Sequence, residues 1–201
     1  MGLNGSMTDV PQTQPKSEKE ALFELALQGA DAWNNHRRQT SYGVLDLSGI
    51  DFTGKDLTGF NFSNTNLSGC IFDFAYLSEA KLVMCQMNRC SARETDFHMA
   101  VLDEAELLHA DLYKSNFAGA SLTEAILTGA SAQEANFAEA DLTQAVVNKG
   151  IFTDADFSGA NLQGTDFTDS DLSWANLDGI QSDAATKWGK NDTAESADAD
   201  S

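Results

Sequence analysis

The sequence has little of several features that mark common protein classes. Of its 201 residues two are proline, three are cysteine and three are histidine, and 12 basic residues stand against 31 acidic ones, a formal net charge of -19. So few bases disfavour direct contact with nucleic acid or with an anionic membrane, because both surfaces attract Lys and Arg. No apolar run is long enough to span a membrane, and the polar segment 1–17 lacks a secretory signal. We therefore expect a cytoplasmic protein without a membrane partner.

Residues suited to catalysis or metal binding are scarce and poorly spaced. Cys70, Cys85 and Cys90 do not have the spacing of a zinc site and are interpreted as small buried side chains. His98 and His109 are eleven positions apart, which does not match the coil period derived below. We find no phosphate-binding loop and no Ser–His–Asp arrangement. The sequence therefore predicts a protein that is not an enzyme and that binds no cofactor and no metal.

What the sequence does have is a repeat with a period of five. From Leu47 to Leu177 every fifth position is a centre, 27 in all, of which fourteen are Leu and nine are Phe. The residue two positions before each centre is small in every unit after the first four, and the residue directly before the centre is Asp or Asn in 15 units. A period of five fits neither a helix nor a flat strand. This period fits a chain of short extended segments that turns a corner in every unit. The small residue and the centre of each unit would then point inward.

Four such corners close a square coil of about 20 residues, and successive coils would stack at about 4.8 Å, the spacing of hydrogen-bonded strands. The centres then sort into four columns, and one of them places four phenylalanines in succession: Phe97, Phe117, Phe137 and Phe157. This sorting is what a coil of four units predicts. The chain is thus expected to be an all-β solenoid.

Units such as Ala110-Asp111-Leu112-Tyr113-Lys114 and Ala160-Asn161-Leu162-Gln163-Gly164 resemble the pentapeptide repeat family, whose pattern is A(D/N)LXX. The resemblance covers residues 45–179 without insertion or deletion. It implies a right-handed quadrilateral β-helix, here of about seven coils and about 33 Å at the strand spacing.

Both ends of the repeat carry segments of different character. Residues 1–17 are interpreted as a tag remnant followed by a disordered N-terminus. The capping box Ser17-Glu18-Lys19-Glu20 predicts a single helix over 18–38, within a capping region 18–40, that covers the first coil. The β-helix is assigned to 45–180. Thr186-Lys187-Trp188 resembles the closing segment of bacterial family members, which gives a C-terminal cap over 181–190, and 191–201 is expected to be a disordered acidic tail.

The acidic residues of the repeat are unevenly distributed. We name the faces of the rod by their first centres: first (Leu47), second (Phe52), third (Leu57) and fourth (Phe62). Their net charges are -2, -5, -5 and -3, so the second and third faces form the candidate acidic interaction face. Its residues are Asp51, Asp73, Glu94, Asp111, Glu134, Asp154 and Asp171 on the second face and Asp56, Glu79, Asp96, Glu139, Asp156 and Asp178 on the third.

This acidity has two interpretations. In the first, charge keeps the rod soluble and the protein is a non-catalytic scaffold for an unknown protein partner. In the second, the repeat imitates DNA, since a net charge of -15 over about 33 Å approaches the charge density of a duplex. The family resemblance implies the same, because some members are DNA mimics that bind a type II topoisomerase such as DNA gyrase and confer quinolone resistance. This chain departs from those members in having no interrupting loop and a polar C-terminal tail.

A second candidate surface is apolar. Outward positions of the fourth and first faces carry a possible patch, formed by Val83, Met84, Val101, Leu108, Ile126 and Val146. Such a patch would serve a protein contact or self-association, and isolated exposed apolar residues are the alternative. We expect a monomer or a weak dimer.

Overall fold

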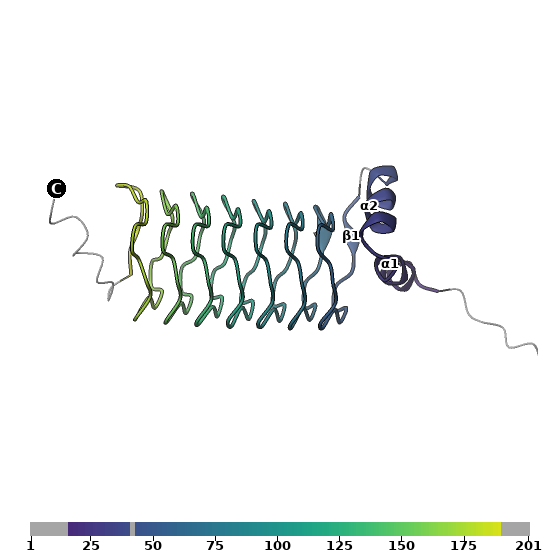
Figure 1. The fold of residues 1–201 in the computed structure, drawn as a ribbon, viewed down its shortest axis with the longest axis horizontal. Coiled ribbons are helices and arrows are strands. Elements are labelled where there is room, and N and C mark those ends of the chain that lie inside the picture. Colours follow the sequence, from purple (N-terminus) through teal and green to yellow (C-terminus); the bar gives the residue numbers. More distant parts are fainter. Residues whose placement is uncertain (1–15, 41–42, 190–201) are drawn as a thin grey trace, which may run out of the picture.

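The computed structural model describes residues 16–40 and 43–189, and all statements about structure refer to these residues. A stack of similar coils is closed at its N-terminal end by two helices, α1 (Glu18–Ala26) and α2 (Ala30–Gln39) (Figure 1). Two short parallel strands, β1 (Leu45–Asp46) and β2 (Thr65–Asn66), begin the stack. No helix within these ranges has the length and apolar content to cross a membrane.

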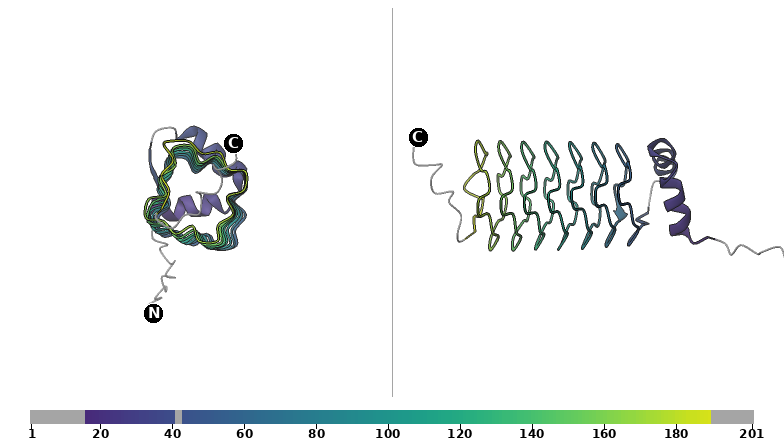
Figure 2. Two further views of the ribbon diagram at one scale, coloured as in Figure 1. Left: turned by 90° about the vertical axis from the view of Figure 1, so that its left-hand side faces the viewer. Right: turned by 60° about the horizontal axis from the view of Figure 1, so that its bottom comes forward.

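Each coil pairs with the next at a constant register through most of the stack. Leu45 pairs with Thr65, and single parallel bridges continue at the same offset from Asp51 with Ile71 to Asn161 with Gln181. Viewed along the rod, the coils superimpose as a four-sided outline (Figure 2). The repeat period therefore gives the β-solenoid that the sequence predicts. The extended segments are short because a corner interrupts them in every unit.

Each corner is a tight turn that needs a left-handed residue. The backbone N–H of the next small residue typically donates to the carbonyl of the preceding centre, as from Ala75 to Phe72 at 2.8 Å. The second residue after the centre has a positive φ in all 27 units, from +52° at Glu94 to +72° at Gly49. This is the geometry of a type II turn, which favours Gly or Asn at that position. Eighteen of these residues are nevertheless not glycine.

The interior is filled by the two apolar positions of every unit. Nearly all of the small residues and centres between Leu47 and Leu172 are buried. The four predicted phenylalanines of the third face do stack, with ring centroids 4.6, 4.9 and 5.0 Å apart and planes within 6° of parallel. Offset aromatic contacts of this kind stabilise the column beyond the area that they bury.

Polar small residues are accommodated by a recurring hydrogen bond between coils. Thr95 Oγ1 donates to the carbonyl of Phe72, and Cys70 Sγ and Cys85 Sγ donate to those of Leu47 and Phe62. In each case the acceptor is the centre that lies 23 positions earlier. A hydroxyl or thiol can therefore replace alanine in the core without leaving its proton unpaired.

The N-terminal cap corrects one prediction, because two helices are present where one was expected over 18–38. Gly29 lies between them with φ of +98°, a conformation that a helix cannot contain. The capping box at Ser17 is confirmed, with Glu20 N donating to Ser17 Oγ and Ser17 N donating to Glu20 Oε2. The break allows α1 and α2 to turn across the end of the coil, as the views in Figure 2 show.

Side chains of α2 take the place of a preceding coil. Asn34 Nδ2 donates to the carbonyl of Gly59 at 3.0 Å, and Asn34 Oδ1 accepts from the backbone N–H of Asn61 at 2.8 Å. Trp33 is fully buried and its Nε1 donates to the carbonyl of Asn61. The first coil's edge thus finds partners in side chains, which protects it from pairing with another chain.

The predicted C-terminal cap takes the form of one further coil segment. Trp188 stacks on Phe167 with centroids 5.5 Å apart and planes 2° from parallel, and Lys187 bridges to Asp166 at an offset of 21. The extra residue is absorbed by a turn in which Asp183 Oδ1 accepts from the backbone N–H groups of Gly164 and Thr186. The described chain ends at residue 189, so the predicted acidic tail lies outside it, as does the predicted N-terminal segment before residue 16.

Candidate interaction surfaces

The Asp or Asn before each centre has a structural role in its own corner. In all 15 units that carry one, its side-chain oxygen accepts a hydrogen bond from the backbone N–H two positions later. This is the local bond by which Asx side chains favour turns. In three of the units that lack an Asp or Asn before the centre, a side chain of the preceding coil accepts from this N–H instead, as when Asp73 Oδ1 accepts from Arg93 N. Asp and Asn at these positions therefore stabilise the turn in the same way, whether or not the side chain is charged.

The acidic residues predicted for the interaction face all reach solvent. Glu94, Glu134, Asp154, Glu79 and Glu139 are exposed at corners, and Asp51, Asp56 and Asp171 are exposed along the faces. Asp178, near the C-terminal end, is also exposed. The other four residues are half-buried: Asp73, Asp96, Asp111 and Asp156. The structure brings these residues together as two adjacent faces, as the frame of the repeat requires.

The second face is partly neutralised. Arg93 Nη1 lies 2.8 Å from Asp111 Oδ2, and Lys114 Nζ lies 3.1 Å from Glu134 Oε2. The hydrogen bonds from Lys114 and from the Tyr113 hydroxyl lower the pKa of Glu134. Exposed pairs of this kind contribute little to stability, but they cancel charge in the middle of the face.

The third face keeps a more continuous negative charge. Its acids are Asp56, Glu79, Asp96, Glu139, Asp156 and Asp178, and its one base within the repeat, Lys55, lies in the first coil. Asp96 accepts from Asn116 Nδ2 and Asp156 accepts from Asn176 Nδ2, so neutral amides hold these carboxylates in place. This face is the better candidate for a partner that carries positive charge.

A further set of acids stands where the backbone would prefer glycine. Eight of the eighteen left-handed residues other than glycine are acidic: Glu79, Glu94, Glu104, Glu124, Glu134, Glu139, Asp154 and Asp169. A side chain in this conformation costs on the order of 1 kcal/mol. Turn geometry therefore does not account for these carboxylates, in contrast to the residues before the centres.

The six residues of the predicted apolar patch are placed on the first and fourth faces and their corners. Met84 is 48% exposed, and Val83, Val101, Leu108, Ile126 and Val146 are half-buried. Ile126 and Val146 are bridged neighbours in adjacent coils. The six residues do not all lie on neighbouring positions, so their action as one site stays a prediction.

Other apolar side chains that the sequence reasoning missed are more exposed. Ile71, Phe74 and Tyr76 surround one corner of the second face, with Phe74 and Tyr76 each 55% exposed. Trp174 is 87% exposed at the corresponding corner of the last coil, with φ of +65°. All four residues occupy outward positions of the repeat, and this spacing is the feature of the sequence that could have predicted their exposure.

The described residues show little that could support chemistry. No group of three or more His, Cys, Asp or Glu within them could hold a metal ion. The three cysteines are free and buried, and burial raises the pKa of Cys70 to about 11 and that of Cys85 to about 12. Such thiols are poor nucleophiles because the thiolate is the reactive form.

Comparison with known proteins concerns the repeat. The family model for pentapeptide repeats matches in eight copies, over residues 46–82, 70–107, 85–117, 110–148 and 152–180. No curated protein sequence matches the chain.

Several solved structures are similar to the chain. HetL, a pentapeptide repeat protein involved in heterocyst differentiation regulation from the cyanobacterium Nostoc sp. strain PCC 7120, is 20% identical; the match covers 76% of this chain and 94% of HetL, with a TM-score of 0.33. A trypsin-treated QnrB1, a plasmid-mediated fluoroquinolone resistance protein, is 18% identical over 70% of this chain and 91% of its own, with a TM-score of 0.41. Rfr23 from the cyanobacterium Cyanothece 51142 is 22% identical over 77% and 97%, with a TM-score of 0.25. These likenesses carry no argument about function.

Proposed function

The chain belongs to the pentapeptide repeat family, and from that premise we propose that it is a non-catalytic scaffold whose acidic rod binds a protein partner. In this proposal the rod is a right-handed quadrilateral β-helix of about seven coils, at the strand spacing of about 4.8 Å. Rigid coils hold rows of carboxylates at fixed spacing, so a complementary basic surface meets them with little loss of side-chain order.

The acids at left-handed corners support this proposal. The left-handed backbone at these positions favours Gly or Asn, yet eight of them carry Glu or Asp in spite of the conformational energy that this costs. Solubility alone would be served by acids at any outward position, without that cost. The third face, where Glu79 and Glu139 stand among acids with one basic neighbour in the first coil, is the proposed contact surface.

Two double variants test the proposal. Glu79→Asn with Glu139→Asn removes two charges from the corner of the third face, and Glu104→Asn with Glu124→Asn removes two from the corner of the fourth. Both pairs occupy the same turn position, and Asn tolerates the left-handed conformation better than Glu. Partners captured from the source cell should be lost with the first variant and kept with the second. Equal capture by both variants would contradict the proposal.

DNA mimicry is the second candidate, favoured by the charge of the repeat. Its net -15 over about 33 Å is one charge per about 2.2 Å, against about 1.7 Å for duplex DNA. The partner would then be a DNA-binding protein such as gyrase, with an effect on quinolone sensitivity. A supercoiling assay with purified gyrase decides: inhibition that the third-face variant relieves supports mimicry, and no effect at micromolar protein excludes it.

The proposed scaffold is a cytoplasmic monomer or weak dimer. Its three cysteines are free thiols, as expected in a reducing compartment. Sedimentation across a range of protein concentrations tests the oligomeric state.

A further inference from the structure

Three exposed apolar side chains of the second coil are not explained by the fold. Ile71, Phe74 and Tyr76 surround the corner between the second and third faces, and we call these three residues the aromatic corner. Phe74 has φ of +60°, so a large apolar side chain occupies a turn position where the backbone favours Gly or Asn. Its ring is more than half exposed, so burial does not compensate for the conformational cost. Stability alone would therefore favour another residue at this position.

Apolar surface continues from this corner toward the cap. Tyr76 is the bridged neighbour of Asp56 in the first coil. Beside Asp56 a hollow of about 90 Å³ opens between the end of α1 and the first coil, with Leu27, Phe52 and Leu57 among its walls. Leu27 directly follows α1 and is 53% exposed. The aromatic corner and the hollow are thus one coil apart on the same side of the rod.

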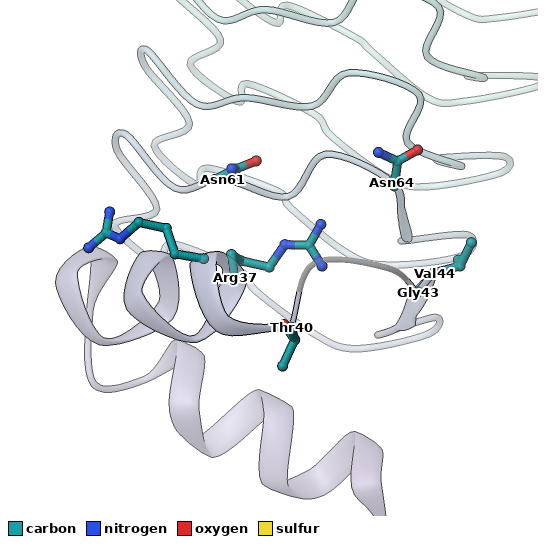
Figure 3. Close-up of a pocket in the computed structure, with 7 residues that line it drawn as sticks. Arg37, Thr40, Gly43, Val44, Asn61 and Asn64 are labelled. Carbon is teal, nitrogen blue, oxygen red and sulfur yellow. The ribbon is translucent and has the colours of Figure 1, made fainter.

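A different side of the cap is held by polar contacts. On the fourth face, the Arg37 guanidinium extends from α2 toward the first coil (Figure 3), and its Nη2 donates to the carbonyl of Ser63. Its Nε and Nη1 are shielded from solvent and have no hydrogen-bond partner in the part of the chain that the structure describes. The cap therefore presents apolar surface to solvent at Leu27 and not along this side.

The aromatic corner is surrounded by negative charge. Five carboxylates lie one position along the chain or one coil away from its three residues, and no Lys or Arg occupies such a position: Asp51, Asp56, Asp73, Glu94 and Asp96. Lys55 and Arg93 are one position further away, and Arg93 is paired with Asp111. A ligand at this corner therefore meets an apolar centre with a negatively charged border.

This combination matches a ligand that is both basic and apolar. Aromatic ring faces and carboxylates each attract Lys and Arg side chains, through cation–π contacts and charge-assisted hydrogen bonds. The exposed rings and Leu27 gain free energy when an apolar side chain covers them. Aromatic residues at the centre of a contact also supply much of the binding energy in many protein interfaces. An acidic segment would be repelled by the five carboxylates.

We propose that the aromatic corner and the hollow at Leu27 anchor a basic segment of the protein partner. An apolar side chain of that segment packs on Phe74, Tyr76 and Leu27, and its Lys or Arg residues contact the surrounding carboxylates. This inference rests on the proposed function and adds the position and the chemistry of the main contact. The third face, which begins at Tyr76 and Asp56, then continues the contact along the rod.

Fluorescence polarisation of short labelled peptides tests the proposal with the full chain at physiological ionic strength. One peptide alternates arginine with leucine and phenylalanine, a second has serine in place of the apolar residues, and a third has glutamate in place of arginine. We expect the first peptide to bind saturably, the second at least tenfold more weakly and the third not at all. Equal binding of the first two peptides would overturn the proposal, because charge alone would then account for it.

A pair of matched variants shows whether binding occurs at this corner. Phe74→Asn removes the ring and places in the left-handed turn a residue that tolerates it, so the midpoint of urea unfolding should stay the same or rise. The same variant should weaken the first peptide at least tenfold. Trp174→Asn is the control, because Trp174 is an exposed aromatic residue at the same turn position of the same corner in the last coil. It should bind as the native chain does, and an equal loss in both variants would contradict the assignment.

The outcomes also separate this inference from the proposed function. If Glu79→Asn with Glu139→Asn loses the captured partner while Phe74→Asn keeps both partner and peptide, the third face is the contact surface and the anchor is wrong. If Phe74→Asn loses both while the double variant keeps them, the anchor is correct and the third face is not the contact surface. Concentration-dependent self-association that Phe74→Asn abolishes would show that a second copy covers the corner, and would overturn the proposal.

Discussion

Two buried threonines at equivalent positions predict opposite effects of the same substitution. Thr65 and Thr95 both occupy the small inward position and are 1% and 0% exposed. Thr95 Oγ1 donates to the carbonyl of Phe72 at 2.7 Å, whereas Thr65 Oγ1 has no partner among the described residues. The acceptor of Thr95 is the centre 23 positions earlier, and no centre of the repeat lies that far before Thr65, because the first centre is Leu47.

Replacing each threonine by valine keeps the side-chain shape and removes only the hydroxyl. Thr95→Val loses one neutral hydrogen bond, about 1 kcal/mol, and the Phe72 carbonyl keeps its bond from Ala75 N. Thr65→Val removes an unpaired buried hydroxyl, whose burial costs about 1–3 kcal/mol. The extra buried methyl group is common to both variants. The free energies of unfolding should therefore differ by about 2–4 kcal/mol, with Thr65→Val the more stable.

Equilibrium unfolding in urea, followed by far-ultraviolet circular dichroism, measures the difference from the two midpoints. The comparison requires the same slope for both variants, because repeat proteins can unfold in parts. If both substitutions shift the midpoint in the same direction and by the same amount, the hydrogen bond between coils does not explain the polar small residues.

Three further predictions concern other parts of the rod. Phe117→Ala should lower the free energy of unfolding by about 3–5 kcal/mol, and Phe117→Leu by clearly less, because the ring lies 4.6 and 4.9 Å from its neighbours in the column; the same urea titration measures both. The cysteines should not react with a thiol reagent at pH 8 until the protein is unfolded, because burial raises the pKa of all three thiols. Asp166 has a pKa lowered to about 2 by hydrogen bonds from Thr168 and Lys187, so its charge stabilises the fold above pH 4 and this stabilisation is lost as the pH falls through 2. Asp166→Asn should therefore cost about 1 kcal/mol at pH 7, after allowance for the exposed lysine, and nothing at pH 1.5; no difference between the two pH values would refute this.

The coils could be predicted from the sequence because every unit repeats the same local problem. The five-residue spacing predicts both a corner in every unit and a backbone pairing partner one coil later. Neither feature depends on contacts with distant parts of the chain. The Phe97–Phe157 column and the buried cysteines followed directly. The outward acids followed as well, since a fixed frame assigns each position to a face.

The two ends of the rod were harder to predict because their residues depart from the five-residue spacing. The helical pattern continues through Gln28 and Gly29, so periodicity alone predicts one helix. The structure has two helices because the chain turns at this point to cover the edge of the first coil. At the other end one inserted residue displaces Trp188 from the spacing of the repeat. The structure accommodates the inserted residue in a turn where Asp183 Oδ1 accepts hydrogen bonds from three backbone N–H groups, and the sequence alone does not indicate these bonds.

The functional surface was predictable in position but not in character. The spacing shows that Arg93 and Lys114 lie on the second face, but not that they pair with Asp111 and Glu134. The exposure of Trp174 depends on what its neighbours leave uncovered. The unpaired nitrogens of Arg37 arise from the way α2 docks on the first coil, for which the repeat contains no signal.

The charge of the rod can be separated from its fold. At the position before the centre, Asn and Asp accept the same hydrogen bond, and the 15 units use six Asn and nine Asp. At the left-handed corner, Gly is the residue that the backbone favours, and eight units carry an acid instead. Both positions thus admit a neutral residue that serves the turn as well or better. The negative charge is therefore an added property of this rod rather than a consequence of folding it. The second and third faces carry equal net charge, but the third has one base and lacks the ion pairs of the second, so it is the face that we expect a basic partner to contact.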